Sequence, residues 1–512
     1  MPRIARCSPS PIQRGNVPSG IEGRNAALTS CAPSRPSMSR RQFILVGASS
    51  LLLSACQAAP APSVPVSPAA AARYAIGDLL RTTPFYVAHR GSGDNWVEHS
   101  LDSYSRSIGS GATAIEVSVS ATSDGVFVCH HDLTTKRMTG VDLTIAEVTW
   151  KELSQLRSDA TAWLGPAAKQ QPLPLLADVL NAFAATHVIF LEDKQGTNTE
   201  ALLELMDSYP QSTEHVIWKQ WAGAAQYALV DEHGYTTWGY FTPELYERAD
   251  ELAPRFDLLG VSHRATDAQV ATLVGYGKPV IAWEVHFRSM RDRMSDLGVA
   301  GMMCSNLPYV TGTTAASQGD AFGTGLRAAG DLPWTVDAGT RVQPVIDGEA
   351  GSVTLDHHDV QSYLMGSMCP VGPGSYRITC ELRWPGSLPR AEQHAGIAFG
   401  IADDRPYRVR VATDVSGYHL VLRANGSLEL FSRAAGSTDG TRLKMMATAP
   451  PRAAEWVRLQ LEVLANSIRI LRLDGEGWSM EIDDASNRGG YFWLCKNYPG
   501  EPPVEFRSIV VS

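Results

Sequence analysis

Short apolar segments recur along residues 84–310, and stretches with helical spacing of apolar positions lie between them. The helical stretches include 100–111, 175–186 and 289–298. The apolar segments are 85–90, 113–119, 187–194, 215–221, 235–241, 256–262, 279–285 and 300–306. Eight strands with helical crossovers predict an α/β protein with a (βα)8 TIM barrel. A doubly wound open sheet is the alternative, but no GxGxxG sequence follows any of these strands.

The second strand leads into a hairpin rather than a helix. Its sequence "TAIEVSV" is followed by "VFVCHHD" at 126–132, and the turn contains Asp124-Gly125, a favoured hairpin pair. Such a short connection cannot cross over to a parallel neighbour, so the two segments must pair antiparallel. The hairpin therefore brings Glu116 and His131 toward one open end, on the side of a barrel where active sites gather.

Charged side chains cluster at the predicted carboxyl ends of the first three strands and of the hairpin. They are His89, Arg90, Glu116, His131, Glu192 and Lys194. Any one of them alone is explained as a polar strand end in contact with solvent. Together they predict an active site, because TIM-barrel sites are assembled from the ends of several strands.

The residue types at this rim indicate phosphodiester chemistry. Two carboxylates at one rim raise each other's pKa or bind a divalent cation, and oxygen ligands favour Ca²⁺ or Mg²⁺. An Arg and a Lys beside them form a clamp for an anionic group, most naturally a phosphate. Two imidazoles supply a general base and a general acid near neutral pH.

Several motifs in the barrel resemble the glycerophosphodiester phosphodiesterase family, within the phospholipase C-like phosphodiesterase superfamily. The matching stretches are "AHRG" (88–91), "EHSLDSYSRSIGSGATAIEVSV" (98–119), "SDGVFVCHHDLTTKRMTG" (123–140), "DLTIAEV" (142–148), "PLPLLADVL" (172–180), "IFLEDK" (189–194) and "VIAWEV…GVAGMMCSNLP" (280–308). The resemblance implies general acid/base catalysis by His89 and His131, metal binding by Glu116 and Glu192, and phosphate binding by Arg90 and Lys194. His131 rather than His130 takes the family position, because it directly precedes Asp132.

Two departures from the family pattern concern the metal site and the barrel rim. The family's Glu-x-Asp is here Glu116-Val117-Ser118, so Glu98, His130 or a water would have to replace the missing carboxylate. The last strand ends in "CSN" at 304–306 and lacks the family's Asp. Trp283, near the end of the seventh strand, is expected either to wall the substrate pocket or to be an ordinary aromatic of the rim.

The N-terminal segment resembles an export signal. Arg40-Arg41 precede a short apolar segment that ends in "LSAC" at Cys56, as in a twin-arginine signal with a lipoprotein cleavage box. The resemblance predicts a signal over 38–56, lipidation of Cys56 and an Ala/Pro linker over 57–73. Residues 1–37 are either a disordered extension or precede the true start at Met38. We expect an exported lipoprotein, at the cell surface or in the periplasm, anchored to the membrane.

Beyond the barrel (74–313) and a Gly/Ser/Thr-rich linker (314–333), residues 334–512 alternate apolar and polar positions. Asn425-Gly426 between two alternating runs is a strong hairpin signal, and an antiparallel β-sandwich is predicted. The pattern resembles concanavalin A-like or laminin G-like modules, some of which bind sugars. Trp456, Trp478 and Trp493 either offer stacking faces to a glycan or pack within the sandwich.

Composition narrows the partners and the redox chemistry. The net charge of −9 is spread along the chain, which argues against a nucleic-acid partner. The eight cysteines include no CxxC pair, so neither a zinc knuckle nor a redox motif is indicated. Cys369 and Cys380 are close enough in sequence for a local disulfide.

The leading hypothesis is a metal-dependent hydrolase that converts glycerophosphodiesters to glycerol phosphate and an alcohol. One alternative is cleavage of a lysophospholipid headgroup. Another is a non-catalytic, glycan-binding surface lipoprotein with a degenerate barrel.

Overall fold

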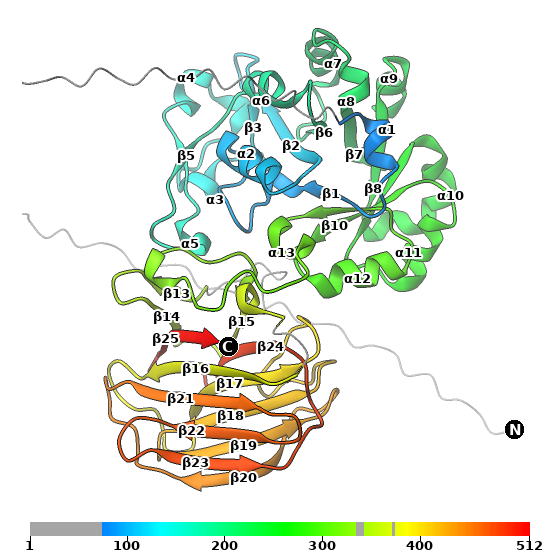
Figure 1. The fold of residues 1–512 in the computed structure, drawn as a ribbon. Helices are drawn as coiled ribbons and strands as arrows, with labels where there is room; N and C mark the ends of the chain where they lie inside the picture. Colours follow the sequence, from blue (N-terminus) through cyan, green and yellow to red (C-terminus); the bar gives the residue numbers. More distant parts are fainter. Residues whose placement is uncertain (1–73, 334–342, 371–373) are drawn as a thin grey trace, which may run out of the picture. The chain divides into compact units, whose positions relative to one another are not determined.

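A computed structural model describes residues 74–333, 343–370 and 374–512 (Figure 1). The predicted signal, Cys56 and the Ala/Pro linker lie outside these residues. Within them, no helix has both the length and the apolar character needed to cross a membrane.

Eight parallel strands close into a barrel, which confirms the predicted fold. Their order around the barrel is β1-β2-β6-β7-β8-β9-β10-β11, and β1 pairs with both β2 and β11. The strands are β1 (Phe85–Ala88), β2 (Ala114–Ala121), β6 (Val188–Asp193), β7 (Val216–Trp221), β8 (Thr236–Phe241), β9 (Leu258–Ser262), β10 (Val280–Val285) and β11 (Gly301–Cys304). Seven of the eight predicted apolar segments contain one of them, and β2 runs two residues beyond the segment 113–119.

Helices follow most of the strands, as the pattern predicted. The helix expected over 100–111 begins at Leu101, because the Ser100 hydroxyl accepts a hydrogen bond from the Ser103 backbone N–H and caps it. The α-helices are α1 (Ile76–Leu80), α2 (Leu101–Gly109), α3 (Lys136–Thr139), α4 (Trp150–Leu153), α5 (Thr161–Leu164), α6 (Leu176–Phe183), α7 (Thr199–Asp207), α8 (Ser212–His215), α9 (Tyr227–Glu232), α10 (Ala249–Leu252), α11 (Asp267–Val274), α12 (Arg288–Asp296) and α13 (Leu307–Thr311).

The predicted hairpin is present as an antiparallel strand added to the barrel. Strand β3 (Phe127–Cys129) pairs with the end of β2, with Val119 opposite Cys129. Gly125 in the turn has a φ of 78°, a left-handed conformation that glycine adopts without steric cost. Because β2 is long and β3 short, the chain after β3 turns back over the carboxyl ends of the barrel strands.

Side chains that point into the barrel change from apolar to polar along the strands. A buried cluster fills the amino-terminal part, and Ile76 and Leu79 of α1 belong to it. Its strand members include Phe85, Val87, Ala114, Val188, Phe190, Ile217, Trp238, Ile281 and Met303. Because side chains alternate along a strand, the next inward positions on β2, β6 and β7 are Glu116, Glu192 and Lys219. The polar groups are thus confined to the carboxyl end.

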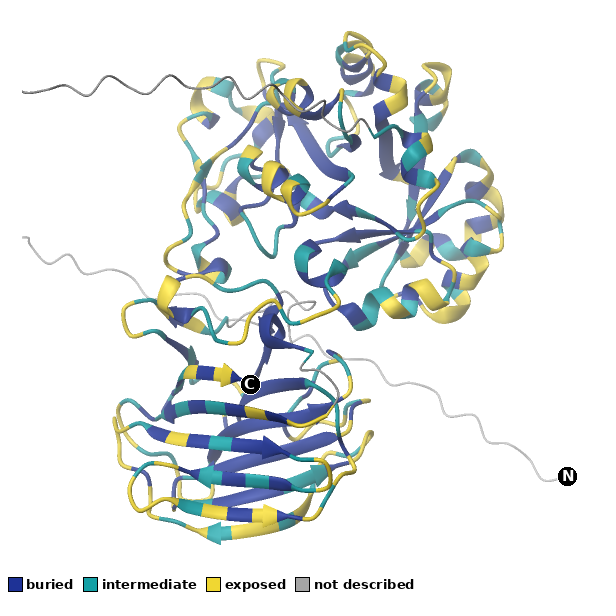
Figure 2. Ribbon diagram, viewed as in Figure 1, coloured by how far each residue is buried: buried dark blue, intermediate teal, exposed yellow. Residues whose placement is uncertain are grey.

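The C-terminal region is an antiparallel β-sandwich, as predicted. Two seven-stranded sheets enclose one apolar core, and along several strands buried positions alternate with more exposed ones (Figure 2). One sheet contains β12 (Asp331–Pro333), β15 (Gln361–Met365), β24 (Tyr491–Lys496), β17 (His394–Ile401), β18 (Gly417–Arg423), β19 (Ser427–Arg433) and β20 (Thr441–Ala447). The other contains β13 (Val345–Asp347), β14 (Ser352–Leu355), β25 (Val504–Val511), β16 (Tyr376–Arg383), β21 (Val457–Val463), β22 (Ile468–Arg472) and β23 (Trp478–Ile482).

The three tryptophans proposed as glycan platforms are engaged within the protein. Trp493 is fully buried in the sandwich core. The guanidinium groups of Arg383 and Arg507 lie 4.3 and 4.0 Å from the Trp456 ring, and that of Arg472 lies 4.9 Å from the Trp478 ring. The packing alternative therefore accounts for Trp493, whereas Trp456 and Trp478 remain partly exposed.

Two further sequence expectations fare differently in the sandwich. Within the alternating residues 334–512, the sequence "YRVRVAT" at 407–413 predicts a strand but forms none; Tyr407 instead packs beneath Arg433, whose guanidinium lies 3.9 Å from the ring. The Asn425-Gly426 turn does join β18 to β19, as predicted. All five cysteines in the described residues are free and buried, so Cys369 and Cys380 form no disulfide.

Candidate active site

A pocket opens at the carboxyl ends of the barrel strands, and most of the predicted site residues line it. Its empty volume is about 390 Å³. The lining residues are His89, Arg90, His131, Glu192, Lys194, Lys219, Trp238, Tyr240, Trp283, Glu284 and Met303. The prediction that strand ends and the hairpin assemble one site is consistent with this geometry.

His89 and Arg90 are positioned by a tight turn directly after β1. Arg90 has a φ of 51°, and its backbone N–H donates to Glu116 Oε2 over 2.8 Å. Gly91 follows with a φ of 74°, and a Cβ there would lie 2.2 Å from Ser103 Oγ, so the turn requires glycine. His89 Nδ1 lies 2.8 Å from Ser305 Oγ, and burial lowers the pKa of His89 to about 4.

His131 is held in the pocket by an acidic neighbour. Its Nδ1 lies 2.7 Å from Asp132 Oδ1, and Asp132 in turn accepts a hydrogen bond from Arg137 Nε over 2.7 Å. The Nε2 atom lies 3.5 Å from Lys194 Nζ. Burial lowers the pKa of His131, and the Asp132 carboxylate opposes that shift. His130 points elsewhere, with Nε2 bonded to the Thr134 carbonyl, as strand alternation predicted.

The two carboxylates predicted to bind metal are both buried and both ion-paired. Glu116 Oε1 accepts from Lys219 Nζ over 2.7 Å and from Ser118 Oγ over 2.9 Å. Glu192 Oε1 accepts from Lys194 Nζ over 3.1 Å and from the Tyr240 hydroxyl over 2.9 Å. The Lys219 ammonium also lies 2.8 Å from Glu192 Oε2, so one lysine bridges both carboxylates. Despite burial, the neighbouring lysines keep the pKa of each carboxyl below its ordinary value.

Comparison with known proteins assigns the barrel to a family. Residues 89–306 match the model of the glycerophosphoryl diester phosphodiesterase family. This segment is a domain of that family. The match begins at His89 and ends at Asn306, so it includes all the residues that line the pocket.

Curated relatives match shorter segments of the chain. A glycerophosphodiester phosphodiesterase of Arabidopsis thaliana is 36% identical over 85 residues, which is 16% of this chain and 22% of that protein. Human glycerophosphodiester phosphodiesterase 1 is 27% identical over 128 residues, 24% of this chain and 39% of that protein. A human lysophospholipase D is 26% identical over 153 residues, 29% of this chain and 47% of that protein. The chain thus spans less than half the length of each.

Solved structures of similar proteins cover a little under half of the chain. An Oleispira antarctica phosphodiesterase in complex with the product sn-glycerol-3-phosphate is 22% identical, with a TM-score of 0.39, over 44% of this chain and 95% of that one. A Thermotoga maritima glycerophosphodiester phosphodiesterase is 20% identical, with a TM-score of 0.36, over 44% of this chain and 96% of that one.

Members of the glycerophosphodiester phosphodiesterase family generally depend on a divalent metal, but the residues of this site do not fit one. Lys219 places a cation between Glu116 and Glu192, the two carboxylates that would hold a metal. Ser118, at the family's Asp position, donates its hydroxyl proton to Glu116 instead of offering a third charged ligand. A divalent ion here would meet both an ammonium and a shortage of anionic ligands.

The alternative third ligands are also engaged elsewhere. Glu98 pairs with Arg137 at 2.5 Å and with Arg90 at 3.4 Å, and His130 is bonded to a backbone carbonyl. Among the residues the structure describes, no three His, Cys, Asp or Glu side chains of the barrel bring ligand atoms within 4.8 Å of one another.

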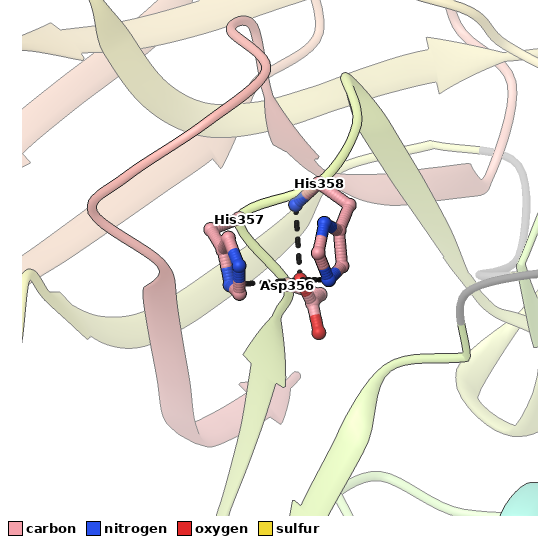
Figure 3. A group of neighbouring side chains, drawn as sticks. All are labelled: Asp356, His357 and His358. Atoms are coloured by element: carbon pink, nitrogen blue, oxygen red, sulfur yellow. Dashed lines mark hydrogen bonds and ion pairs between the residues drawn. The ribbon is translucent and has the colours of Figure 1, made fainter. Parts of the chain in front are cut away.

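One group of metal-ligand type does occur in the described residues, in the loop after β14. The ligand atoms of Asp356, His357 and His358 lie within 4.8 Å of one another, and the three side chains are consecutive and at least partly exposed (Figure 3). None of them lines the barrel pocket.

Four residues of the site were not identified from the sequence. Lys219 and Tyr240 lie within largely apolar strands. For Lys219 the sequence does carry a signal, a lone charge in an apolar strand, which is the signal that indicated Glu116. Glu284 lies 3.9 Å from His89 Nε2 and 3.8 Å from Arg90 Nη2. Ser305, which contacts His89, belongs to the "CSN" segment, in which the sequence alone indicates only the absence of the family's Asp.

Proposed function

We propose that the barrel hydrolyses glycerophosphodiesters to glycerol phosphate and an alcohol. The observation that supports this most is the convergence of His89, His131, Arg90 and two lysines on one pocket in a domain of the phosphodiesterase family. Two imidazoles and three cations around a cavity suit an anionic ester that needs proton transfer at both ends.

The cationic groups are suited to hold the phosphate. Arg90, Lys194 and Lys219 enter the pocket from three different elements, so they can surround a phosphoryl group rather than contact one side of it. A phosphate bound there would accept hydrogen bonds from these cationic groups. Binding from several directions also fixes phosphorus relative to both histidines.

The two histidines are suited to opposite proton transfers. Burial keeps His89 neutral at neutral pH, so its Nε2 can accept the proton of an attacking glycerol hydroxyl or water. Burial also lowers the pKa of His131, and Asp132 only opposes that shift, so His131 acts as the acid in its protonated fraction. A lone pair of the attacking oxygen forms the new P–O bond, while the P–O bond to the alcohol breaks and its electron pair leaves on the alcohol oxygen, which takes the proton from His131. When a glycerol hydroxyl attacks, the product is a cyclic phosphate, which water opens to glycerol phosphate in a second step of the same kind.

Aromatic rings give the pocket an apolar side. Tyr240 and Trp283 lie edge to face, with ring centroids 5.9 Å apart, and both line the cavity. The position of Trp283 supports the prediction that it walls the substrate pocket. A lysophospholipid headgroup remains the second candidate substrate, because one of the similar human proteins is a lysophospholipase D.

The test is an assay of the purified protein with glycerophosphocholine, related diesters and lysophosphatidylcholine. We expect glycerol phosphate or free headgroup alcohol to be released, and His89→Ala or His131→Ala to reduce the rate by about 10²–10⁴-fold. Parallel reactions with Ca²⁺, Mg²⁺ or a chelator test the metal dependence that the sequence predicts. Glycan binding without turnover of any diester would instead favour the non-catalytic alternative.

The protein is further proposed to act outside the cytoplasm, as an exported lipoprotein anchored through Cys56. The support is the order of Arg40-Arg41, apolar segment and "LSAC" in the sequence. Membrane fractionation of the wild type and a Cys56→Ala variant tests it: the variant should leave the membrane fraction, and equal retention of both would contradict the anchor.

A further inference from the structure

Lys219 forms ion pairs with both buried carboxylates of the site. Glu116 is on β2, Glu192 on β6 and Lys219 on β7, three neighbouring strands of the barrel. Only 9% of the Lys219 side chain is exposed, and neither carboxylate side chain exceeds 5%. A buried ion pair of this kind is retained only where its geometry is good, since desolvation of each charge is costly.

The acceptors of Glu116 are already matched with donors. Its two oxygens receive Lys219, the Ser118 hydroxyl and the Arg90 backbone N–H. A metal ligand needs a free lone pair, and here three N–H or O–H groups already occupy most of the roughly four lone-pair sites of the carboxylate. The site is therefore organised for hydrogen-bond donors.

The charges also balance without a metal. Glu116 and Glu192 carry two negative charges, and the ammonium groups of Lys219 and Lys194 lie within 3.1 Å of them. A divalent ion added to this group would leave two positive charges in excess inside the barrel. Like charges at such distances repel strongly where water is excluded.

Ser118 on β2 is neutral and adds no further negative charge beside the two carboxylates. It lies directly opposite Glu192 in the parallel pairing of β2 with β6, so a carboxylate there would face a second one. As a serine it instead donates to Glu116 and adds no charge. The neutral Ser118 and the cationic Lys219 therefore favour the same charge balance, one without a divalent cation.

We propose that Lys219 is a built-in replacement for the divalent cation, so that this domain cleaves phosphodiesters without a metal. One N–H donor of the ammonium is used by Glu116, and the ammonium is ion-paired with Glu192, which leaves donor capacity for a phosphate oxygen in the pocket that Lys219 lines. Lys219 then stabilises the negative charge that develops on the phosphoryl oxygens during cleavage. This inference rests on the proposed function for its catalytic part only.

Activity provides the first test. With a diester that the wild type turns over, we expect an excess of EDTA or added Ca²⁺, Mg²⁺ or Mn²⁺ to leave the rate unchanged. Lys219→Met should reduce it by about 10²-fold or more, the scale for loss of one charge-stabilising donor. Lys151→Met, the same change on an exposed lysine of α4, is the matched control and should retain full activity. A rate that EDTA abolishes and a metal restores would overturn the inference.

Metal binding provides the second test and needs no turnover. Calorimetric titrations with Ca²⁺, Mg²⁺ or Mn²⁺ use a parent that carries His357→Ala and His358→Ala, since that exposed group could itself bind a cation. We expect no binding and no shift of the melting temperature. In the same parent, Ser118→Asp combined with Lys219→Met should create a three-carboxylate site that binds one cation per chain and melts higher when loaded.

The outcomes separate the inference from the proposed function. A parent that binds a cation, with binding lost on Glu192→Gln, contradicts the inference. A folded double variant that binds none also contradicts it, because Lys219 would then not be what excludes the metal. If no diester is turned over under any condition, the proposed function fails, while the titrations still decide whether Lys219 stands in for a cation.

Discussion

Burial is the main influence on the pKa of the His89 imidazole. It lowers that pKa to about 4; Arg90 and Lys219 act in the same direction, whereas Glu284 and Glu116 oppose them. As a general base His89 must be unprotonated. We therefore expect the acidic limb of kcat/KM to lie near pH 4, well below the ordinary histidine value of about 6.5.

Replacing one neighbour should move that limb in a known direction. Glu284→Gln removes a negative charge that favours the protonated imidazole, so the pKa of His89 should fall further and the limb should shift to lower pH. The measurement is kcat/KM against pH for both proteins, with the His89 ring followed by NMR. Residual activity after return to neutral pH controls for unfolding in acid. A limb near 6.5 in the wild type would show that His89 is not the base.

At the residue scale, sequence reasoning found the members of the site that resemble a family motif or stand out as isolated charges. Glu116, Glu192 and both histidines belong to this group. Lys219 was not predicted as a site residue, because its role depends on which strands are neighbours and on their register. The segment "VIWKQW" alone reveals neither. From the sequence, Ser118 counts only as a missing carboxylate, whereas the structure shows that its hydroxyl donates to Glu116.

At the scale of elements, the barrel depends on close contact between neighbouring strands. Gly301 begins β11, and a Cβ at this position would lie 2.3 Å from the ring of Phe85 on β1. The inward ring of Phe85 therefore occupies the space that a larger residue at 301 would need. This contact lies at the amino-terminal end of the barrel, away from the polar rim.

Gly301→Ala should therefore destabilise the barrel by about 1–3 kcal/mol, because overpacking a rigid core displaces side chains or backbone. Gly109→Ala is the control: this glycine ends α2, and nothing lies within 4 Å of the position that an added methyl would take, so stability should be unchanged or slightly higher. Denaturant unfolding of the two variants and the wild type measures the difference. Equal midpoints for Gly301→Ala and the wild type would contradict the packing argument.

The elements themselves were largely predictable, because hydrophobic period and turn chemistry are local properties. The hairpin followed from Asp124-Gly125, and the eight barrel strands followed from apolar segments bounded by polar ones. The failure at 407–413 is instructive, since its alternation is that of a strand. Tyr407 and Arg433 pair there across a loop, a long-range contact that periodicity cannot reveal.

At the scale of the whole molecule, a sandwich residue caps a barrel helix. Asp404, fully buried, accepts from the backbone N–H groups of Arg288 and Ser289 at the start of α12, over 2.6 and 2.9 Å. It also accepts from the Tyr309 hydroxyl over 2.9 Å. Asp404 thus satisfies donors that the helix start would otherwise leave without partners.

Asp404→Ala should accordingly destabilise the molecule by about 1–3 kcal/mol, the cost of leaving buried donors unsatisfied. Asp403→Ala is the neighbouring control, because Asp403 pairs with the exposed Arg405 and such surface pairs contribute little. Thermal unfolding followed by circular dichroism compares them. Equal melting temperatures for the two variants would show that the cap is not stabilising.

Lys219 also changes how the site responds to its surroundings. A site that must recruit an ion is filled only to the extent that the ion's concentration exceeds its dissociation constant, and the fold gains stability with that occupancy. A covalently attached ammonium is present once in every chain, whatever ions surround it. Dilution of the medium then cannot remove this cation from the site, and a more tightly binding transition metal cannot take its place.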